Sequence, residues 1–274
     1  MTTPNPTDRV LSQGAKDRII DAVSRASDEL LARWPRLTGF APASATKTDG
    51  TPVSSADLAS QTILVAAIAS TQPGAVILAE EDTATQCRPG TNVWFVDPLD
   101  GTNLYLAGHS DFAVLVSGWV DDEPVLSVAA FPSESILAVA DHEQATFTAP
   151  DSPPEQLAVH AVYCDLPNIR EAIGGMHPYE IDRFESTRTL VDVARGHAAG
   201  AIVEMCGHAT WDIAAPAHLI SASRGVISDE FGNRIHPHGT TVDFGYLVAA
   251  RSPTLHKRLL HVLAQTTSPE GTAL

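Results

Sequence analysis

Two short apolar segments, each followed directly by acidic residues, constrain the fold of this chain more than any other feature. Residues 75–79 lead into Glu-Glu-Asp at 80–82, and residues 93–96 lead into Asp-Pro-Leu-Asp at 97–100. Apolar runs of this length are typical of buried strands. Open α/β sheets bind their ligands at the carboxyl ends of their strands. The sequence therefore predicts an α/β protein with a ligand site rich in carboxylates.

Hydrophobic periodicity predicts the other elements. Apolar residues three and four apart indicate helices over 16–34, 57–70, 168–174, 190–199, 211–223 and 252–264. A meander of strands is expected over 112–119, 124–131 and 135–140, and further strands over 157–164, 200–205, 226–229 and 247–250. The polar, proline-rich stretch 149–154 is expected to be a surface loop near a subdomain border.

Composition and charge exclude several classes of partner. Of the 274 residues, 44% are hydrophobic and 18% are charged, which is an ordinary globular balance. The formal net charge of -16 argues against binding to nucleic acid or to an anionic membrane surface. The longest apolar stretch, 63–69, is too short to span a bilayer, and the first ten residues lack the apolar core of a signal peptide. Three isolated cysteines, Cys87, Cys164 and Cys206, favour a reducing cytoplasm.

The turn after the second apolar segment has the chemistry of a metal and phosphate site. Asp97 and Asp100 lie three positions apart around Pro98, and two carboxylates in so short a turn repel each other unless a cation lies between them. Mg²⁺ prefers oxygen ligands and is usually bound by a few carboxylates together with substrate phosphate. Gly101 and Thr102 follow at an expected helix start, where free N–H groups favour phosphate oxygens.

Four motifs in order resemble the inositol monophosphatase superfamily. They are Lys-Thr-Asp-Gly-Thr-Pro-Val-Ser-Ser-Ala-Asp at 47–57, Glu-Glu-Asp at 80–82, Asp-Pro-Leu-Asp-Gly-Thr at 97–102 and Trp-Asp-Ile-Ala-Ala at 211–215. The resemblance implies the αβαβα five-layer sandwich of the inositol monophosphatase and fructose-1,6-bisphosphatase type. It also implies two α/β halves, which we place at 1–131, with most metal ligands, and 132–274, with Asp212 and the substrate pocket.

The resemblance also implies roles for individual residues. The ligands of two or three Mg²⁺ ions would be Glu80, Asp97, the carbonyl of Leu99, Asp100 and Asp212. Asp57 and Thr102 would form a hydrogen-bonded pair that, together with Glu80, orients and activates a water molecule. The backbone N–H groups of Gly101 and Thr102 would bind the phosphate. Two bound cations would stabilise both the attacking and the leaving oxygen of an in-line displacement.

Substrate residues are implied less directly. They would be Ser186, Thr187, Arg188 and Glu204. The segment 185–189 has Glu185 where the family commonly has glycine, which leaves the substrate open. Arg188 either binds a second phosphate or a carboxylate, or pairs on the surface with Glu185 or Asp192. Glu204 either binds substrate hydroxyl groups or is a solvated strand end.

The leading expectation is a cytoplasmic, homodimeric, lithium-sensitive enzyme that releases phosphate from a small ester such as an inositol, sugar or histidinol phosphate. A 3′(2′),5′-bisphosphate nucleotidase is the alternative, favoured by Ala-Ala-Pro at 214–216 but not by Asn103, where some such enzymes have lysine. A non-catalytic binding module is a third reading. Retention of the whole acidic set argues against it, because clustered carboxylates without a ligand are costly.

Overall fold

The computed structural model describes residues 11–82, 92–142, 144–148, 158–162, 164, 169, 171, 173, 180–184 and 186–267. The helices are α1 (Gln13–Arg33), α2 (Pro35–Thr38), α3 (Ser55–Thr71), α4 (Thr102–Leu106), α6 (Arg188–Arg195), α7 (Thr210–Ala222) and α8 (Pro253–Thr267), with a 3₁₀ turn η2 (Pro132–Glu134). The strands of the first part are β1 (Ser44–Thr46), β2 (Pro52–Ser54), β3 (Val76–Ala79), β4 (Asn92–Asp100), β5 (Ala113–Val120), β6 (Glu123–Phe131), β7 (Ile136–Asp141) and β8 (Ala145–Phe147). Those of the second part are β9 (Ala158–Val162), β10 (Glu180–Phe184), β11 (Gly200–Glu204), β12 (Val226–Asp229) and β13 (Tyr246–Ala250).

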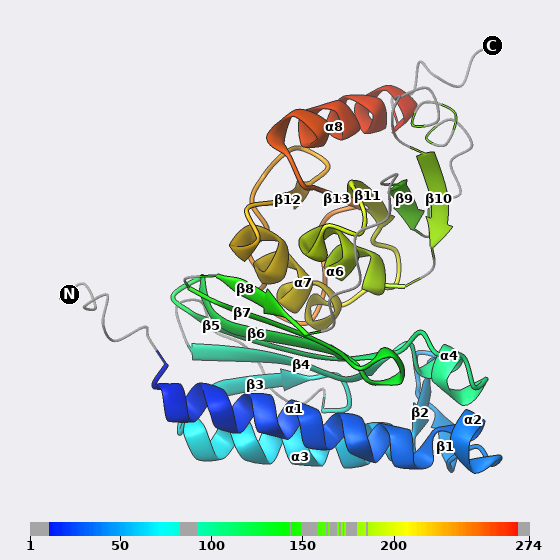
Figure 1. The fold of residues 1–274 in the computed structure, drawn as a ribbon, viewed down its shortest axis with the longest axis vertical. Helices are drawn as coiled ribbons and strands as arrows, with labels where there is room; N and C mark the ends of the chain where they lie inside the picture. Colours follow the sequence, from blue (N-terminus) through cyan, green and yellow to red (C-terminus); the bar gives the residue numbers. More distant parts are fainter. Residues whose placement is uncertain are drawn as a thin grey trace.

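These elements stack in five layers (Figure 1). The helices α1 and α3 form the first layer, and a six-stranded sheet lies on them in the order β3-β4-β5-β6-β7-β8. The third layer is α6 and α7, followed by a five-stranded sheet in the order β10-β9-β11-β13-β12, and α8 covers the far side of that sheet. The layers confirm the predicted αβαβα sandwich.

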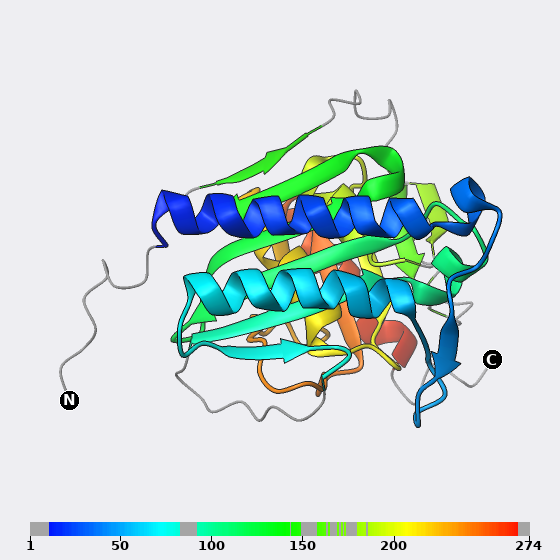
Figure 2. The ribbon, with the colours of Figure 1, turned by 90° about the horizontal axis from the view of Figure 1, so that it is seen from below.

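The helices α1 and α3 lie side by side across one face of the six-stranded sheet (Figure 2). Ser12 caps α1 with its hydroxyl, and the stripe Ile19, Val23, Ala26 and Leu30 is buried because these residues recur on one helical face. Strand β3 runs parallel to β4, and every later pair in this sheet is antiparallel. The expected helix over 16–34 and the expected meander are confirmed.

The helix α7 covers the other face of the same sheet. Ala215 and Leu219 of α7 share an apolar cluster with Leu115 and Phe131 of the sheet, and all four are almost completely buried. Packing of this kind fixes the start of α7 relative to the carboxyl end of β4. The helices of the third layer therefore pack between the two sheets.

The predicted division between 1–131 and 132–274 falls inside the six-stranded sheet, because β7 and β8 carry that sheet to Phe147. The division into two halves stays a prediction. The loop expected at 149–154 lies outside the described residues, and of the helix expected at 168–174 only residues 169, 171 and 173 are described, as helical. None of the helices in the described ranges is long and apolar enough to cross a membrane.

Candidate active site

The acidic turn of 97–100 is a bulge at the end of β4. The sequence predicts a strand that ends at Val96, but β4 continues to Asp100, with Asp97 opposite Leu115 and Asp100 opposite Ala113. The extra residue on β4 bends the strand, and bulges commonly re-aim side chains beside active sites. Oδ1 of Asp97 accepts the backbone N–H of Leu99 at 3.0 Å, which holds the turn closed.

Gly101 makes the sharp step from β4 into α4. Its φ is +79°, and a Cβ built there would lie 2.9 Å from the carbonyl oxygen of Asp111, so only glycine fits without strain. The helix α4 then begins at Thr102, as predicted. Its first N–H groups have no partner within the helix and are available to an anion.

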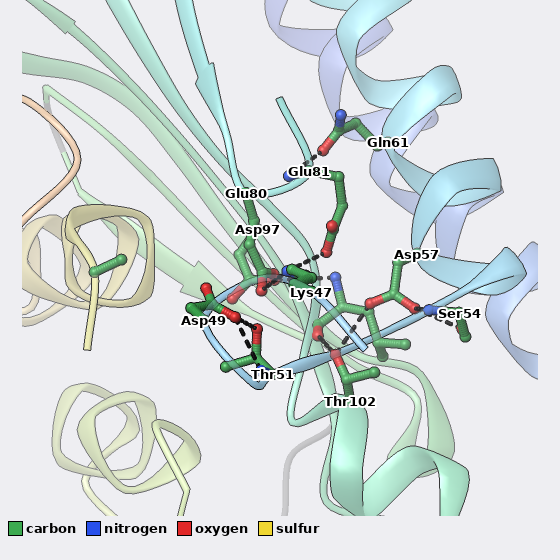
Figure 3. A network of polar contacts seen from close by, with 12 residues as sticks. Lys47, Asp49, Thr51, Ser54, Asp57, Gln61, Glu80, Glu81, Asp97 and Thr102 are labelled. Carbon is green, nitrogen blue, oxygen red and sulfur yellow. Dashed lines mark hydrogen bonds and ion pairs between the residues drawn. The ribbon is translucent and has the colours of Figure 1, made fainter. Parts of the chain in front are cut away.

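Glu80 and Glu81 follow β3, and both pair with the ammonium group of Lys47. Nζ of Lys47 lies 2.7 Å from Oε1 of Glu80 and 2.7 Å from Oε1 of Glu81 (Figure 3). Lys47 comes from the hairpin of β1 and β2, which the sequence did not predict, and it reaches over the strand ends. The hairpin thus places an internal positive charge on the acidic cluster.

Asp57 and Thr102 form the predicted pair. The Thr102 hydroxyl lies 3.0 Å from Oδ1 of Asp57 and 3.0 Å from the carbonyl oxygen of Leu99 (Figure 3). The other carboxylate oxygen of Asp57 accepts the backbone N–H of Ser54 at 2.8 Å, as the third residue of α3 in a capping box. Asp57 is fully buried and is therefore fixed by α3 on one side while it holds Thr102 on the other.

Asp212 reaches the site from the second part of the chain. It is the third residue of α7, and its Oδ2 accepts the backbone N–H of Ala209 at 2.8 Å. This local bond fixes the carboxylate at the helix start. Because α7 packs on β4, Asp212 faces the strand end that carries Asp97 and Asp100.

Burial and mutual repulsion raise the pKa values of this cluster. Burial is the largest cause of the raised pKa of Asp97, followed by the charges of Glu80, Asp100 and Asp212. Burial likewise raises the pKa of Asp100 to about 7 and that of Asp212 to about 8, where the charge of Asp100 adds to it. Burial raises the pKa of Glu81 to about 7, against the opposing effect of Lys47. A divalent cation would relieve this repulsion.

Glu80, Asp97, Asp100 and Asp212 all line one cavity of about 480 Å³, together with Leu99, Gly101 and Thr102. Its remaining walls are Thr51, Pro52, Asn103, Leu104, Cys206, Gly207 and His208. The sequence reasoning missed most of this second group. The signal available was position, since 206–208 directly precede the motif at 211–215 and residues 51–52 lie within the motif at 47–57.

The four expected substrate residues do not line this cavity. Ser186 donates to Oδ1 of Asp111 at 2.9 Å, and Thr187 donates to Oδ2 of Asp100. Arg188 pairs with Asp192, as one of its two interpretations expected, and with Glu134, but its side chain is only 13% exposed and does not lie on the surface. Glu204 is half-buried at the end of β11, two residues before the cavity wall. Their roles in substrate binding stay predictions.

The donor set fits Mg²⁺ by its chemistry. The residues facing the cavity offer four carboxylates and the Leu99 carbonyl, all of them hard oxygen ligands, from groups whose charges otherwise repel. Within the described ranges, no group of three or more His, Cys, Asp or Glu side chains stands where it could hold a metal ion, so the fit to Mg²⁺ rests on the chemistry of the donors.

A five-layer sandwich with carboxylates gathered at the strand ends of its first sheet defines a class of phosphate-ester hydrolases. The inositol monophosphatase family model matches residues 16–268, and the chain belongs to this family. Its inositol monophosphatase and bisphosphate nucleotidase homologues are enzymes that hydrolyse phosphate esters.

Individual relatives differ in their activities. A protein named glucose-1-phosphate thymidylyltransferase from Streptomyces griseus is 33% identical over 203 residues, 70% of this chain and 78% of that protein. Inositol-1-monophosphatase ImpA of Mycolicibacterium smegmatis is 30% identical over 65% of this chain and 68% of its own length. The 3′(2′),5′-bisphosphate nucleotidase CysQ of Aggregatibacter actinomycetemcomitans is 26% identical over 67% of this chain and 74% of its own length.

A solved structure supports the fold. The extragenic suppressor protein suhB of Bartonella henselae superposes with a TM-score of 0.75 at 20% identity, covering 92% of this chain and 98% of that one. At this identity the likeness concerns the architecture alone.

Proposed function

We propose that this protein is a Mg²⁺-dependent phosphomonoesterase that acts on a small phosphorylated metabolite through an activated water molecule. One observation carries the proposal: carboxylates that follow β3, end β4 and open α7 face a single cavity beside the start of α4. Such a cavity offers cation ligands and anion-binding N–H groups next to each other. A phosphate monoester needs both, because its dianion would otherwise be repelled by the acidic walls.

Each residue has a place in the proposed mechanism. Glu80, Asp97, Leu99, Asp100 and Asp212 would hold two or three Mg²⁺ ions. Held there, Mg²⁺ would supply positive charge beside the phosphoryl group and would acidify the attacking water. The N–H groups of Gly101 and Thr102 hold the phosphate oxygens in line for attack. Asp57 accepts a hydrogen bond from the Thr102 hydroxyl. The threonine oxygen is then free to accept a hydrogen bond from the attacking water, with Glu80 beside it.

Phosphate release across a substrate panel tests this proposal. The panel contains inositol 1-phosphate, glucose 1-phosphate, histidinol phosphate and adenosine 3′,5′-bisphosphate, each with Mg²⁺ and with EDTA. We expect phosphate release from at least one monoester with Mg²⁺, its loss in EDTA, and no release by Asp97→Asn. Release that persists in EDTA, or absence of release from every ester, contradicts the proposal.

A 3′(2′),5′-bisphosphate nucleotidase is the second candidate. The similarity to CysQ proteins and the Ala-Ala-Pro sequence at 214–216 favour it. Activity confined to adenosine 3′,5′-bisphosphate in the same panel would select this function. The thymidylyltransferase activity in the name of the Streptomyces griseus relative is tested by adding deoxythymidine triphosphate to the glucose 1-phosphate arm and measuring pyrophosphate.

The family also suggests lithium sensitivity, a homodimer and a cytoplasmic location for this protein, and we include all three in the proposal. Li⁺ and excess Mg²⁺ are expected to inhibit phosphate release. Light scattering coupled to size-exclusion chromatography measures the oligomeric state, and fractionation of the producing cells measures the location. A monomer or a membrane-associated fraction would remove the corresponding part of the proposal without affecting the catalytic part.

A further inference from the structure

A hydrogen bond joins the third layer of the fold to the acidic turn. The hydroxyl of Thr187 donates to Oδ2 of Asp100, a residue 87 positions earlier in the chain. Thr187 directly precedes α6 and is 6% exposed, and Asp100 ends β4 in the wall of the cavity. The bond therefore runs from a buried side chain to a carboxylate that faces the active site.

The Thr187 hydroxyl does not cap the helix that follows it. A threonine at the residue before a helix normally accepts a backbone N–H of the first turn. In α6 this cap is provided by Ser186, whose hydroxyl accepts the N–H of Arg188 at 3.1 Å and whose carbonyl accepts that of Thr189 at 3.3 Å. The Thr187 side chain makes no capping bond. Its hydroxyl is directed at Asp100 instead.

Neighbours on both sides hold the backbone of Thr187 in place. On one side Ser186 donates to Asp111 at 2.9 Å. On the other, the guanidinium group of Arg188 pairs with Glu134 and Asp192 and lies 5.1 Å from the ring centroid of Phe131. Fixed flanking residues make the donor rigid, so the bond constrains Asp100 rather than following it.

We propose that Thr187 is a positioning residue for the metal centre, which fixes one oxygen of Asp100 and so orients this carboxylate toward a bound cation. The inference rests on the proposed function, because it takes Asp100 as a Mg²⁺ ligand. Hydrogen bonds from the outer shell orient metal ligands, and their removal typically lowers metal affinity or activity by about 10- to 100-fold. Thr187 therefore acts through Asp100, and its role differs from the substrate contact that the sequence motif suggests.

Calorimetric titration with Mg²⁺ tests the proposal through binding alone. Thr187→Val removes the hydroxyl and keeps the shape, Thr187→Ala is a second variant in case the first does not fold, and Thr187→Ser restores the donor. Thr189→Val is the matched control: it is the same substitution two residues later, inside α6, at a fully buried threonine whose hydroxyl bonds to His160 and not to a carboxylate of the cavity. We expect the Mg²⁺ dissociation constant to rise about 10- to 100-fold in Thr187→Val or Thr187→Ala. It should stay within about threefold of wild type in Thr187→Ser and in the control.

Two results would overturn the inference. One is a wild-type dissociation constant in Thr187→Val and Thr187→Ala. The other is an equal loss in Thr189→Val, which would assign the effect to packing of α6. The phosphate-release panel is scored separately. If the wild-type protein binds Mg²⁺, Thr187→Val weakens that binding and no ester is hydrolysed, the positioning role is supported and the enzyme function is rejected. A wild-type protein that binds no Mg²⁺ would reject both.

Discussion

The hydroxyl of Thr102 lies 3.0 Å from Oδ1 of Asp57, although 45 positions separate the two residues in the sequence. Thr102 begins α4 and Asp57 belongs to the first turn of α3, so the bond joins the helix start at the cavity to the helix layer beneath the sheet. Both side chains are buried. Thr102 lines the cavity, so the role that we propose for this pair in orienting the attacking water has a direct test.

Thr102→Ala is expected to lower kcat by roughly 10²- to 10⁴-fold, the usual contribution of positioned acid–base groups. Thr102→Ser, which keeps the hydroxyl, should retain most of the activity. The measurement is steady-state phosphate release on the best ester of the panel, with circular dichroism as a check on folding. Equal activity of the alanine and serine variants would remove Thr102 from the mechanism.

Asp97→Asn is expected to abolish Mg²⁺-dependent turnover and to stabilise the metal-free protein. The carboxylate is 2% exposed and is repelled by Glu80, Asp100 and Asp212, so a neutral amide removes repulsion while Oδ1 still accepts the N–H of Leu99. Loss of one metal ligand should reduce the rate ~10³-fold or more. Thermal unfolding in EDTA should show a higher Tm for the variant than for wild type. A lower Tm would mean that the charge of Asp97 is compensated in the metal-free fold.

The stability of the metal-free protein is expected to fall as pH rises from 6.5 to 8.5. Burial raises the pKa of Asp100 to about 7 and that of Asp212 to about 8, so the folded state holds protons that the unfolded state has already released. The free energy of unfolding therefore decreases with pH in this window. Burial lowers the pKa of His208 and His256, and that of His218 to about 4, so these three histidines oppose the slope at the start of the window and cease to do so as the pH rises toward 8.

Thermal unfolding at several pH values in EDTA measures this slope. Saturating Mg²⁺ should flatten it, because the cation compensates the ionised carboxylates. Asp212→Asn should flatten part of it without metal. A Tm in EDTA that rises between pH 6.5 and 8.5 would contradict the assignment of raised pKa values to Asp100 and Asp212.

Lys47→Met is expected to destabilise the metal-free protein and to enlarge the stabilisation by Mg²⁺. Lys47 neutralises Glu80 and Glu81, and the side chain of Glu81 is only 4% exposed. Removal of the Lys47 ammonium group should therefore lower the free energy of unfolding by roughly 1–3 kcal/mol. The matched control is Lys16→Met, which breaks a 2.5 Å pair with Asp141 away from the cavity. The Mg²⁺-induced change in Tm should differ from that of wild type in Lys47→Met but not in Lys16→Met. Equal Mg²⁺-induced shifts in all three proteins would show that Lys47 does not compete with a cation.

The parts of the site that the sequence predicts are those encoded by local contrast. An apolar strand that runs directly into carboxylates is visible without a structure, and it predicts the turn at 97–100. Asp57 and Asp212 lie at the starts of predicted helices, and their place in the site was implied by the family resemblance. The hairpin of β1 and β2 was missed because its strands are three residues long and polar, without an apolar alternation.

Contacts set by distant residues could not be predicted. The sequence offers Asp192 as a partner for Arg188, but Glu134, 54 positions away, becomes a neighbour only after the sheet and α6 have packed. The same holds for Thr187, since its motif suggests a substrate contact while the bond to Asp100 depends on how the third layer sits on β4. Local propensity carries no information on such pairings.

The position of α7 has a consequence for biosynthesis. The face of the six-stranded sheet that bears Leu115, Ala129 and Phe131 is covered by Ala215 and Leu219, which the ribosome delivers only after the last strand of that sheet. A chain that ends after β8 therefore lacks both the side chains that cover this face and the Asp212 carboxylate. The single helix α7 supplies the two together, so we expect a product truncated before α7 to aggregate and to lack the proposed activity.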